Sequence, residues 1–282
     1  MNGKIGFYPG CSLKGSSREY AESTLALAEA LGIPLTEIDD WNCCGASSAH
    51  AVSKSLSLAL PARILALAAE QGFEEIVVPC AACYNRLSLT AHELSRDPQA
   101  KQAVENALDM PLDRPVRILN VLQWLEKYAP GRIAEKRVRA LEKRVACYYG
   151  CLLVRPASVL GFDRVEDPQT MDALLREAGA KPLDWAFKTE CCGGGMTIPD
   201  TDTVAALSGD VLQDAVSRGA EAIVVACPMC HANLDMRRAA INRCLEKPVD
   251  IPVLYITQAL GLALGLSAGQ LGLERHFVPV NL

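Results

Sequence analysis

Two pairs of adjacent cysteines are the residues in this chain best suited to do chemistry. One pair lies in "DWNCCGASSAH" (40–50) and the other in "ECCGGG" (190–195). Adjacent thiols cannot easily bond to each other across an unstrained trans peptide, so each sulfur must be used elsewhere or stay free. The chain has 12 cysteines in 282 residues, and its start, "MNGKIGFYPGC", lacks the apolar core of a secretory signal. We therefore expect a cytoplasmic protein with metal-binding or redox-active cysteines, because cytosolic thiols stay reduced.

Each cysteine pair belongs to a larger set of five. The first cysteine set is Cys11, Cys43, Cys44, Cys80 and Cys83, and the second cysteine set is Cys151, Cys191, Cys192, Cys227 and Cys230. Both sets end in a CxxC motif, "CAAC" in the first and "CPMC" in the second. The sequence thus predicts two metal sites with five thiolates each.

Three kinds of site compete for such a set. Structural zinc takes four ligands, usually as two CxxC pairs, so five sulfurs are one too many, although zinc in one half stays an alternative. A dithiol redox site would use the CxxC motifs alone and leave the CC pairs without a role. An iron–sulfur cluster accepts soft thiolates and contains several irons, so adjacent cysteines can bind different metal atoms. The arrangement favours iron–sulfur clusters.

An internal duplication predicts which elements position these cysteines. The order of segments from "KIGFYPGC" (4–11) is repeated from "RVACYYGC" (144–151), which indicates one domain at 1–143 and another at 144–282. Each half alternates short apolar runs with helical patterns such as "YAESTLALAEAL" (20–31). We expect an α/β fold of two Rossmann-like halves, each with a small parallel sheet flanked by helices.

The cysteines follow the predicted strands of each half. Those of the first half are "IGFYP", "LTEID", "EIVVP" and "RILNV", and those of the second are "VACYY", "KPLDW", "AIVVA" and "VLYIT". Ligands of open parallel sheets bind at the carboxyl ends of the strands. Three successive strands therefore deliver five sulfurs to one edge in each half.

The spacing resembles that of the cysteine-rich CCG domain, and its duplication resembles the B-type subunit of heterodisulfide reductase. In the first half, 31 residues separate Cys11 from Cys43 and 35 separate Cys44 from Cys80; the second half has gaps of 39 and 34 residues. The resemblance covers essentially the whole chain. It implies a noncubane [4Fe-4S] cluster in each half, held by that half's cysteine set. It also implies catalysis: homolytic cleavage, or formation, of a disulfide held between the halves.

The resemblance implies partner subunits as well. No GxGxxG fingerprint follows the first strand of either half, and the usual ferredoxin cysteine run is absent. The implied partners are a ferredoxin-like subunit of the C type with [4Fe-4S] clusters and a flavin-containing subunit of the A type. A non-catalytic electron-transfer subunit, as in lactate, glycolate, succinate or fumarate enzymes, is the alternative function.

Two histidines and two further cysteines could also contribute to the chemistry. His231 follows "CPMC" and His50 follows the first CCG, so either could donate a proton to a leaving thiolate, although a packing role is the simpler interpretation. Cys147 aligns with Phe7 as a core residue, and Cys244 is interpreted as a spare structural thiol.

Two segments and the net charge indicate how the chain relates to other proteins, to membranes and to nucleic acids. The basic segment 132–144 is interpreted as a solvated helix that links the two domains, with docking of an acidic partner or an anionic substrate as the alternative. The apolar segment 256–273 predicts a packed helix after a strand, not a membrane span. The net charge of -5 argues against a nucleic-acid partner.

Overall fold

Two four-stranded parallel sheets organise the molecule. The computed structural model describes residues 4–46 and 49–281, except for the side chain of His50. The first sheet has the order β2-β1-β3-β4, formed by β1 (Ile5–Phe7), β2 (Leu35–Glu37), β3 (Glu75–Val77) and β4 (Arg117–Leu119). The second has the matching order β6-β5-β7-β8, formed by β5 (Arg144–Tyr148), β6 (Lys181–Pro182), β7 (Ala222–Val225) and β8 (Val253–Tyr255). All eight predicted strands and the duplicated α/β fold are confirmed.

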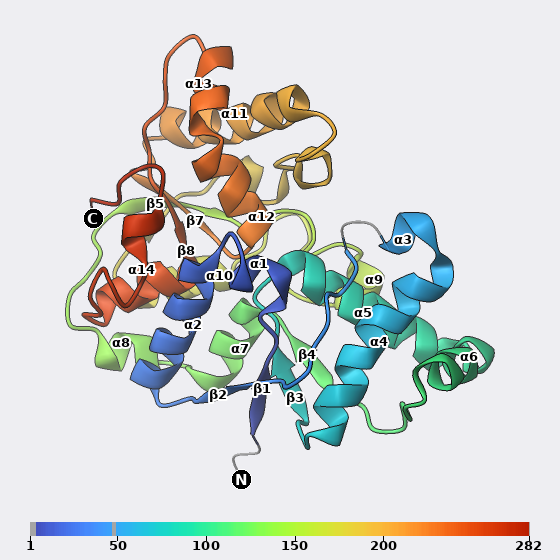
Figure 1. Cartoon of the computed structure of the whole chain (residues 1–282). Helices are drawn as coiled ribbons and strands as arrows, with labels where there is room; N and C mark the ends of the chain where they lie inside the picture. Colours follow the sequence, from blue (N-terminus) through green and yellow to red (C-terminus); the bar gives the residue numbers. More distant parts are fainter. Residues whose placement is uncertain (1–3, 47–48, 282) are drawn as a thin grey trace.

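Helices flank both sheets (Figure 1). Those of the first half are α1 (Gly10–Lys14), α2 (Arg18–Leu31), α3 (Ala49–Val52), α4 (Lys54–Glu70), α5 (Ala81–Arg96), α6 (Pro98–Leu108), α7 (Val121–Tyr128) and α8 (Arg132–Lys136). Those of the second are α9 (Ala157–Leu160), α10 (Thr170–Glu177), α11 (Thr201–Ser217), α12 (Pro228–His231), α13 (Arg238–Cys244) and α14 (Ile256–Ala263). The division at residues 143 and 144 remains a prediction, and β5 begins at that point.

The central strands are buried because helices cover both faces of each sheet. β1 and β7 are buried along their whole length, as near-continuous apolar strands of parallel sheets require. Cys147 lies in β5 with no exposed surface, which confirms the prediction that it is a core residue. The core therefore holds the strands rigidly, and the loops at their carboxyl ends are free to build a site.

The two halves pack on each other through α2 and α14. Tyr20 of α2 stacks on Tyr255 with ring centroids 4.0 Å apart, and both rings are fully buried. The hydroxyls of Ser23 and Thr257 lie 2.7 Å apart in the same buried contact. Figure 1 shows the orange-red α14 beside the blue α2. The contact holds residues more than 230 positions apart in one core.

The basic segment 132–144 differs from the predicted linking helix. Only Arg132–Lys136 is helical, and Val138 already donates its backbone N–H to the carbonyl of Ala263. Arg132 and Lys136 donate hydrogen bonds to the carbonyls of Leu31 and Ala30 at the end of α2. These side chains complement the negative end of the α2 dipole. Residues 132–144 are exposed except for Ile133, Leu141 and Lys143, so the predicted solvent exposure is present, whereas the helix is shorter than predicted.

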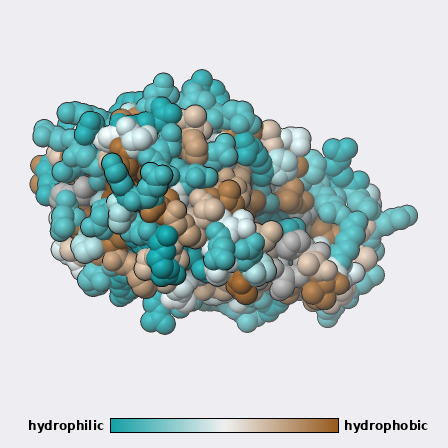
Figure 2. All heavy atoms as spheres, turned by 90° about the horizontal axis from the view of Figure 1, so that it is seen from above, coloured by the Kyte–Doolittle hydropathy of each residue, from teal (hydrophilic) through white to brown (hydrophobic). Residues whose placement is uncertain are grey.

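The apolar segment 256–273 is α-helical only over α14, where the predicted packed helix after a strand is confirmed. None of the helices that the structure describes is both long and apolar enough to span a bilayer. The face of the molecule in Figure 2 is largely hydrophilic, with hydrophobic side chains scattered over it.

Candidate metal centre

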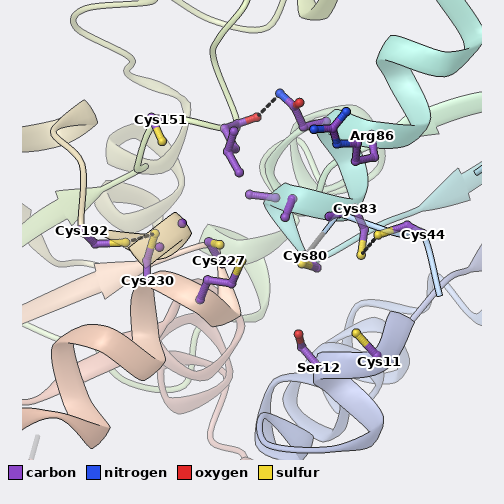
Figure 3. Close-up of a pocket in the computed structure, with 18 of the residues that line it drawn as sticks. Cys11, Ser12, Cys44, Cys80, Cys83, Arg86, Cys151, Cys192, Cys227 and Cys230 are labelled. Atoms are coloured by element: carbon purple, nitrogen blue, oxygen red, sulfur yellow. Dashed lines mark hydrogen bonds between the residues drawn. The ribbon is translucent and has the colours of Figure 1, made fainter. Parts of the chain in front are cut away.

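A single cavity of about 460 Å³ lies between the halves and is lined by both cysteine sets in full. Figure 3 shows the sulfurs of Cys11, Cys44, Cys80 and Cys83 on one side and those of Cys151, Cys192, Cys227 and Cys230 on the other. The carboxyl ends of parallel strands meet at one edge, which explains how the loops after β1, β2 and β3 converge. The second half repeats this arrangement. The structure thus brings together all ten cysteines singled out from the sequence.

The first cysteine set is compact. The Sγ atoms of Cys44 and Cys83 lie 3.1 Å apart, and those of Cys11 and Cys43 lie 3.9 Å apart. Cys80 is the N-cap residue of α5, so the CxxC motif occupies the first turn of this helix. The backbone N–H of Gly45 donates to Cys43 Sγ at 3.4 Å. The helix start and the amide both favour negative charge on these sulfurs.

The second cysteine set has the same layout with one addition. Cys192 Sγ lies 3.6 Å from Cys230 Sγ, and Gly193 N–H donates to Cys191 Sγ at 3.3 Å. The side-chain amide of Asn233 donates to the Cys192 carbonyl at 3.0 Å and lies 3.7 Å from its Sγ. The two sites therefore share a plan but differ in their hydrogen bonds to sulfur.

Hydrogen bonds between the thiols lower the pKa of one cysteine in each CC pair, whereas burial raises the pKa of Cys151. Interaction with Cys43, and then with Cys83, lowers the pKa of Cys44 to about 3. Interaction with Cys230 lowers the pKa of Cys192 to about 7, whereas burial raises the pKa of Cys151 to about 11. Each CC pair thus has one sulfur that favours the thiolate, which is the form that binds metal.

A tyrosine and a glycine before each first cysteine were missed by the sequence reasoning. Tyr8 donates its hydroxyl hydrogen to the carbonyl of Asn42, and Tyr148 donates to that of Glu190, so each ring braces a CC loop. Gly10 and Gly150 have positive φ, and a Cβ there would lie 3.1 Å and 2.9 Å from the sulfurs of Cys83 and Cys230. The shared pattern Tyr-x-Gly-Cys, "YPGC" and "YYGC", was the available signal.

The donor set fits iron–sulfur clusters. No disulfide joins any of these cysteines, although sulfurs approach one another closely in both sets. A zinc ion would use only four of the sulfurs around the cavity. Soft thiolates in groups of five suit clusters with several irons, and the missing Cβ atoms of Gly10 and Gly150 leave room beside the sulfurs.

The histidines do not share this arrangement. His231 is buried outside the cavity lining, where it stacks on Tyr255 and its Nε2 lies 3.1 Å from the Val253 carbonyl oxygen. Burial, and then His276, lowers its pKa well below the ordinary value, and its contacts agree with the packing interpretation. A role of His231 as a proton donor stays a prediction. The side chain of His50 lies outside the described residues. Cys244 is exposed at the end of α13 and does not line the cavity.

Comparison with known proteins identifies the same repeat. The family CCG, described as "Cysteine-rich domain", matches residues 5–88 and 145–235. The 8-methylmenaquinol:fumarate reductase membrane anchor subunit of Wolinella succinogenes is 30% identical over 100% of this chain and 99% of its own. The B-type subunit of the ferredoxin:CoB-CoM heterodisulfide reductase of Methanosarcina mazei is 30% identical over 98% of this chain and 94% of its own.

A solved structure shares the fold. A hypothetical protein from Helicobacter pylori superposes with a TM-score of 0.81 over 100% of this chain and 53% of its own, at 12% sequence identity. This likeness concerns the fold alone.

Proposed function

The chain belongs to the CCG cysteine-rich domain family, among the relatives of the B-type subunit of heterodisulfide reductase, and on that premise we propose that it catalyses the reduction of a disulfide to two thiols. Its family membership makes it an iron–sulfur electron-transfer subunit. The proposal adds a catalytic role, with a noncubane [4Fe-4S] cluster held by each cysteine set. Reversal of the reaction, which forms the disulfide, depends only on the reduction potentials.

The observation that carries the proposal is the shared cavity. The cavity of about 460 Å³ would hold the clusters as well as a substrate, and both complete cysteine sets open into it. A disulfide bound there would lie next to both sites, whereas a chain that only passes electrons along does not need its two sites to share one space. The cavity also has an apolar part, formed by Ala81, Ala82, Leu152 and Met229, which limits water around the reacting sulfurs.

The balance of the reaction assigns roles to the residues. One disulfide, two electrons and two protons give two thiols, and bound clusters would supply the electrons one at a time. The two cysteine sets lie on opposite sides of the cavity and would each hold a cluster there, so each sulfur of the disulfide could face one of them. Of the side chains that the structure describes, no histidine lines the cavity, and we propose that water or a partner supplies the protons.

The electrons must come from another protein. We propose a ferredoxin-like C-type subunit with [4Fe-4S] clusters as the donor, which would itself receive electrons from a flavin-containing A-type subunit. The relatives named above as subunits of reductases support assembly into a complex.

Removing one cysteine from each set tests the catalytic role. We expect Cys43→Ser and Cys191→Ser each to lower the iron and sulfide content and to abolish disulfide reduction by dithionite-reduced viologen, measured on protein purified without oxygen. Cys244→Ser is the matched control, because this exposed thiol does not line the cavity. Unchanged turnover in either cysteine variant would contradict the proposal.

A second candidate function is electron relay without disulfide chemistry. The equal identity to the fumarate reductase subunit of Wolinella succinogenes favours it. The paramagnetic resonance spectrum of the oxidised protein separates the two functions. A spectrum that added thiols perturb supports catalysis, and one that no thiol changes supports relay.

A further inference from the structure

Arg86 is the only lysine or arginine among the described residues that line the cysteine cavity. It lies on α5, one turn after Cys83, and its side chain is half-buried. Figure 3 places it on the same side of the cavity as Cys83 and Cys44. Within the described part of the chain, its guanidinium makes no hydrogen bond or ion pair, unlike Arg63 and Arg155, which pair with Asp40 and Glu166. Arg86 is therefore available to a ligand.

The neighbouring polar groups of the cavity are already engaged. Asn85 donates its amide hydrogens to the carbonyls of Leu152 and Arg155, at 3.2 Å and 2.7 Å. These bonds fix α5 against the second half and so hold the backbone of Arg86 in place. Tyr149 donates its hydroxyl hydrogen to Asp172 Oδ2 at 2.7 Å. Among these groups, Arg86 alone has free donors.

The charge of the cavity makes this cation significant. Two sets of metal-bound thiolates, in a chain of net charge -5, would disfavour any anionic molecule in the space between them. A guanidinium offsets that repulsion locally and can bind a carboxylate through two parallel hydrogen bonds. An anionic substrate would therefore have one preferred orientation.

Arg86 also lines a second pocket, of about 430 Å³, on the outer part of α5. That pocket includes Leu89, Thr90 and Arg96 from the same helix and Ser57 from α4. Arg86 thus stands where the two spaces adjoin. A substrate bound there can keep its sulfur in the cysteine cavity while the rest of the molecule extends outward.

We propose that Arg86 binds the anionic group of a thiol or disulfide substrate and orients its sulfur toward the cysteine sets. The proposal rests on the proposed function and narrows the substrate class to disulfides that carry an acidic group, such as a carboxylate. Arg86 acts as a specificity-determining residue. The simpler role, in which Arg86 only balances the charge of the metal sites, predicts different behaviour.

A panel of matched thiols distinguishes these roles in the cluster-loaded wild-type chain. The probes are 3-mercaptopropionate and 6-mercaptohexanoate, each compared with the alcohol of the same length. Affinities come from isothermal titration calorimetry and from the thiol-induced change in the paramagnetic resonance spectrum. A charge-assisted pair is worth about 1.5 kcal/mol or more, so we expect at least one carboxylate to bind about tenfold or more tightly than its alcohol.

Variants then test whether Arg86 causes the preference for carboxylate thiols over alcohol thiols. We expect Arg86→Gln to abolish the difference between carboxylate and alcohol, with iron content unchanged, and Arg86→Lys to keep part of it. Arg114→Gln is the matched control, because it removes one exposed positive charge that does not line the cavity and should keep the full preference.

The other possible results contradict either the role of Arg86 alone or the proposed function as well. Equal affinity for acids and alcohols in the wild type overturns the role of Arg86 but leaves the proposed function standing. So does an Arg86→Gln variant that weakens both kinds of thiol equally, which is the result that charge balance predicts. If no thiol binds or changes the spectrum, the proposed function itself fails and the inference falls with it. If Arg86→Gln loses iron, the thiol affinities of the wild type and of Arg86→Lys still decide whether Arg86 binds the anionic group.

Discussion

At the scale of single residues, each metal site depends on a glycine that leaves room for a sulfur. Gly150 has φ +66, and a Cβ there would lie 2.9 Å from Cys230 Sγ, closer than real Cβ contacts come. Gly10 stands in the same relation to Cys83, with φ +64 and 3.1 Å. Both the backbone conformation and the contact therefore exclude larger residues.

We predict that Gly150→Ala lowers the iron and sulfide content per chain, because the methyl group displaces Cys230 from its place in the second set. Iron and sulfide assays and the visible absorbance measure the effect. Gly161→Ala is the matched control: its φ is +54 but nothing lies within 4 Å of the added methyl, so it carries backbone strain alone. Equal iron in the two variants would show that strain, not crowding of the sulfur, determines the result.

The cysteines, and the Tyr-x-Gly-Cys pattern that supports them, can be found in the sequence, whereas the surroundings of His231 and Arg86 cannot. Five cysteines at matching places in two repeats identify themselves by residue type and order. His231 follows the second CxxC motif, so a proton-donor role and a packing role were both open, and its side chain contacts Tyr255 and Val253. Nothing in the sequence pointed to Arg86. Only the three-dimensional structure shows that its guanidinium forms no hydrogen bond or ion pair with the described residues.

At the scale of elements, Glu75 ties β3 to the helix and strand beside it. Its carboxylate accepts hydrogen bonds from Lys127 and Tyr128 of α7 and lies 3.4 Å from Arg117 Nε of β4. Burial alone would raise the pKa of Glu75, but the hydrogen bonds from Lys127 and Tyr128 lower it below its ordinary value. Ionised Glu75 therefore stabilises the edge of the first sheet.

We predict that Glu75→Gln lowers the free energy of unfolding at pH 7 by about 1 to 2 kcal/mol, since it removes charge-assisted hydrogen bonds. A carboxyl group with a lowered pKa stabilises the fold above its unfolded pKa of about 4.3, and this contribution disappears as the pH falls through the lower folded value. The difference between wild type and variant should therefore vanish in acid. Urea unfolding of the iron-free chain, whose result does not depend on acid-labile clusters, measures it between pH 7 and pH 3.

The adjacent Glu74 provides the comparison. It is exposed, and its side chain forms no ion pair with any residue that the structure describes. Glu74→Gln should leave the free energy of unfolding unchanged at every pH. A difference for Glu75→Gln that persists in acid would mean that shape, not charge, explains the loss.

Elements were more predictable than their packing partners. Strands and the helices at 18–31 and 54–70 follow from apolar periodicity, a local property of the sequence. The contacts of the basic segment 132–144 could not be predicted because its partners, the last carbonyls of α2 and the carbonyl of Ala263, lie far away in sequence. Charge pattern alone cannot show that an exposed segment also donates hydrogen bonds to the end of another helix.

At the scale of the whole molecule, the cavity exists only while the halves stay together. The buried contact between α2 and α14 includes the stacked rings of Tyr20 and Tyr255 and the hydroxyl pair of Ser23 and Thr257. Arg275 also forms an ion pair with Glu22 across the halves. Since these contacts are largely buried, the two halves should unfold as one cooperative unit despite their separate sheets.

We predict that Thr257→Val lowers the melting temperature of a single calorimetric transition. The substitution keeps the shape of the side chain but removes a buried hydroxyl–hydroxyl bond, which costs about 1 kcal/mol. Because the bond joins the halves, the whole transition should move, and no second transition should separate from it. The control is Thr36→Val, at an exposed position of β2 within one half, which should leave the melting temperature at the wild-type value. Two transitions, only one of which shifts, would show that the halves are independent bodies and that the cavity between them is not held by this contact.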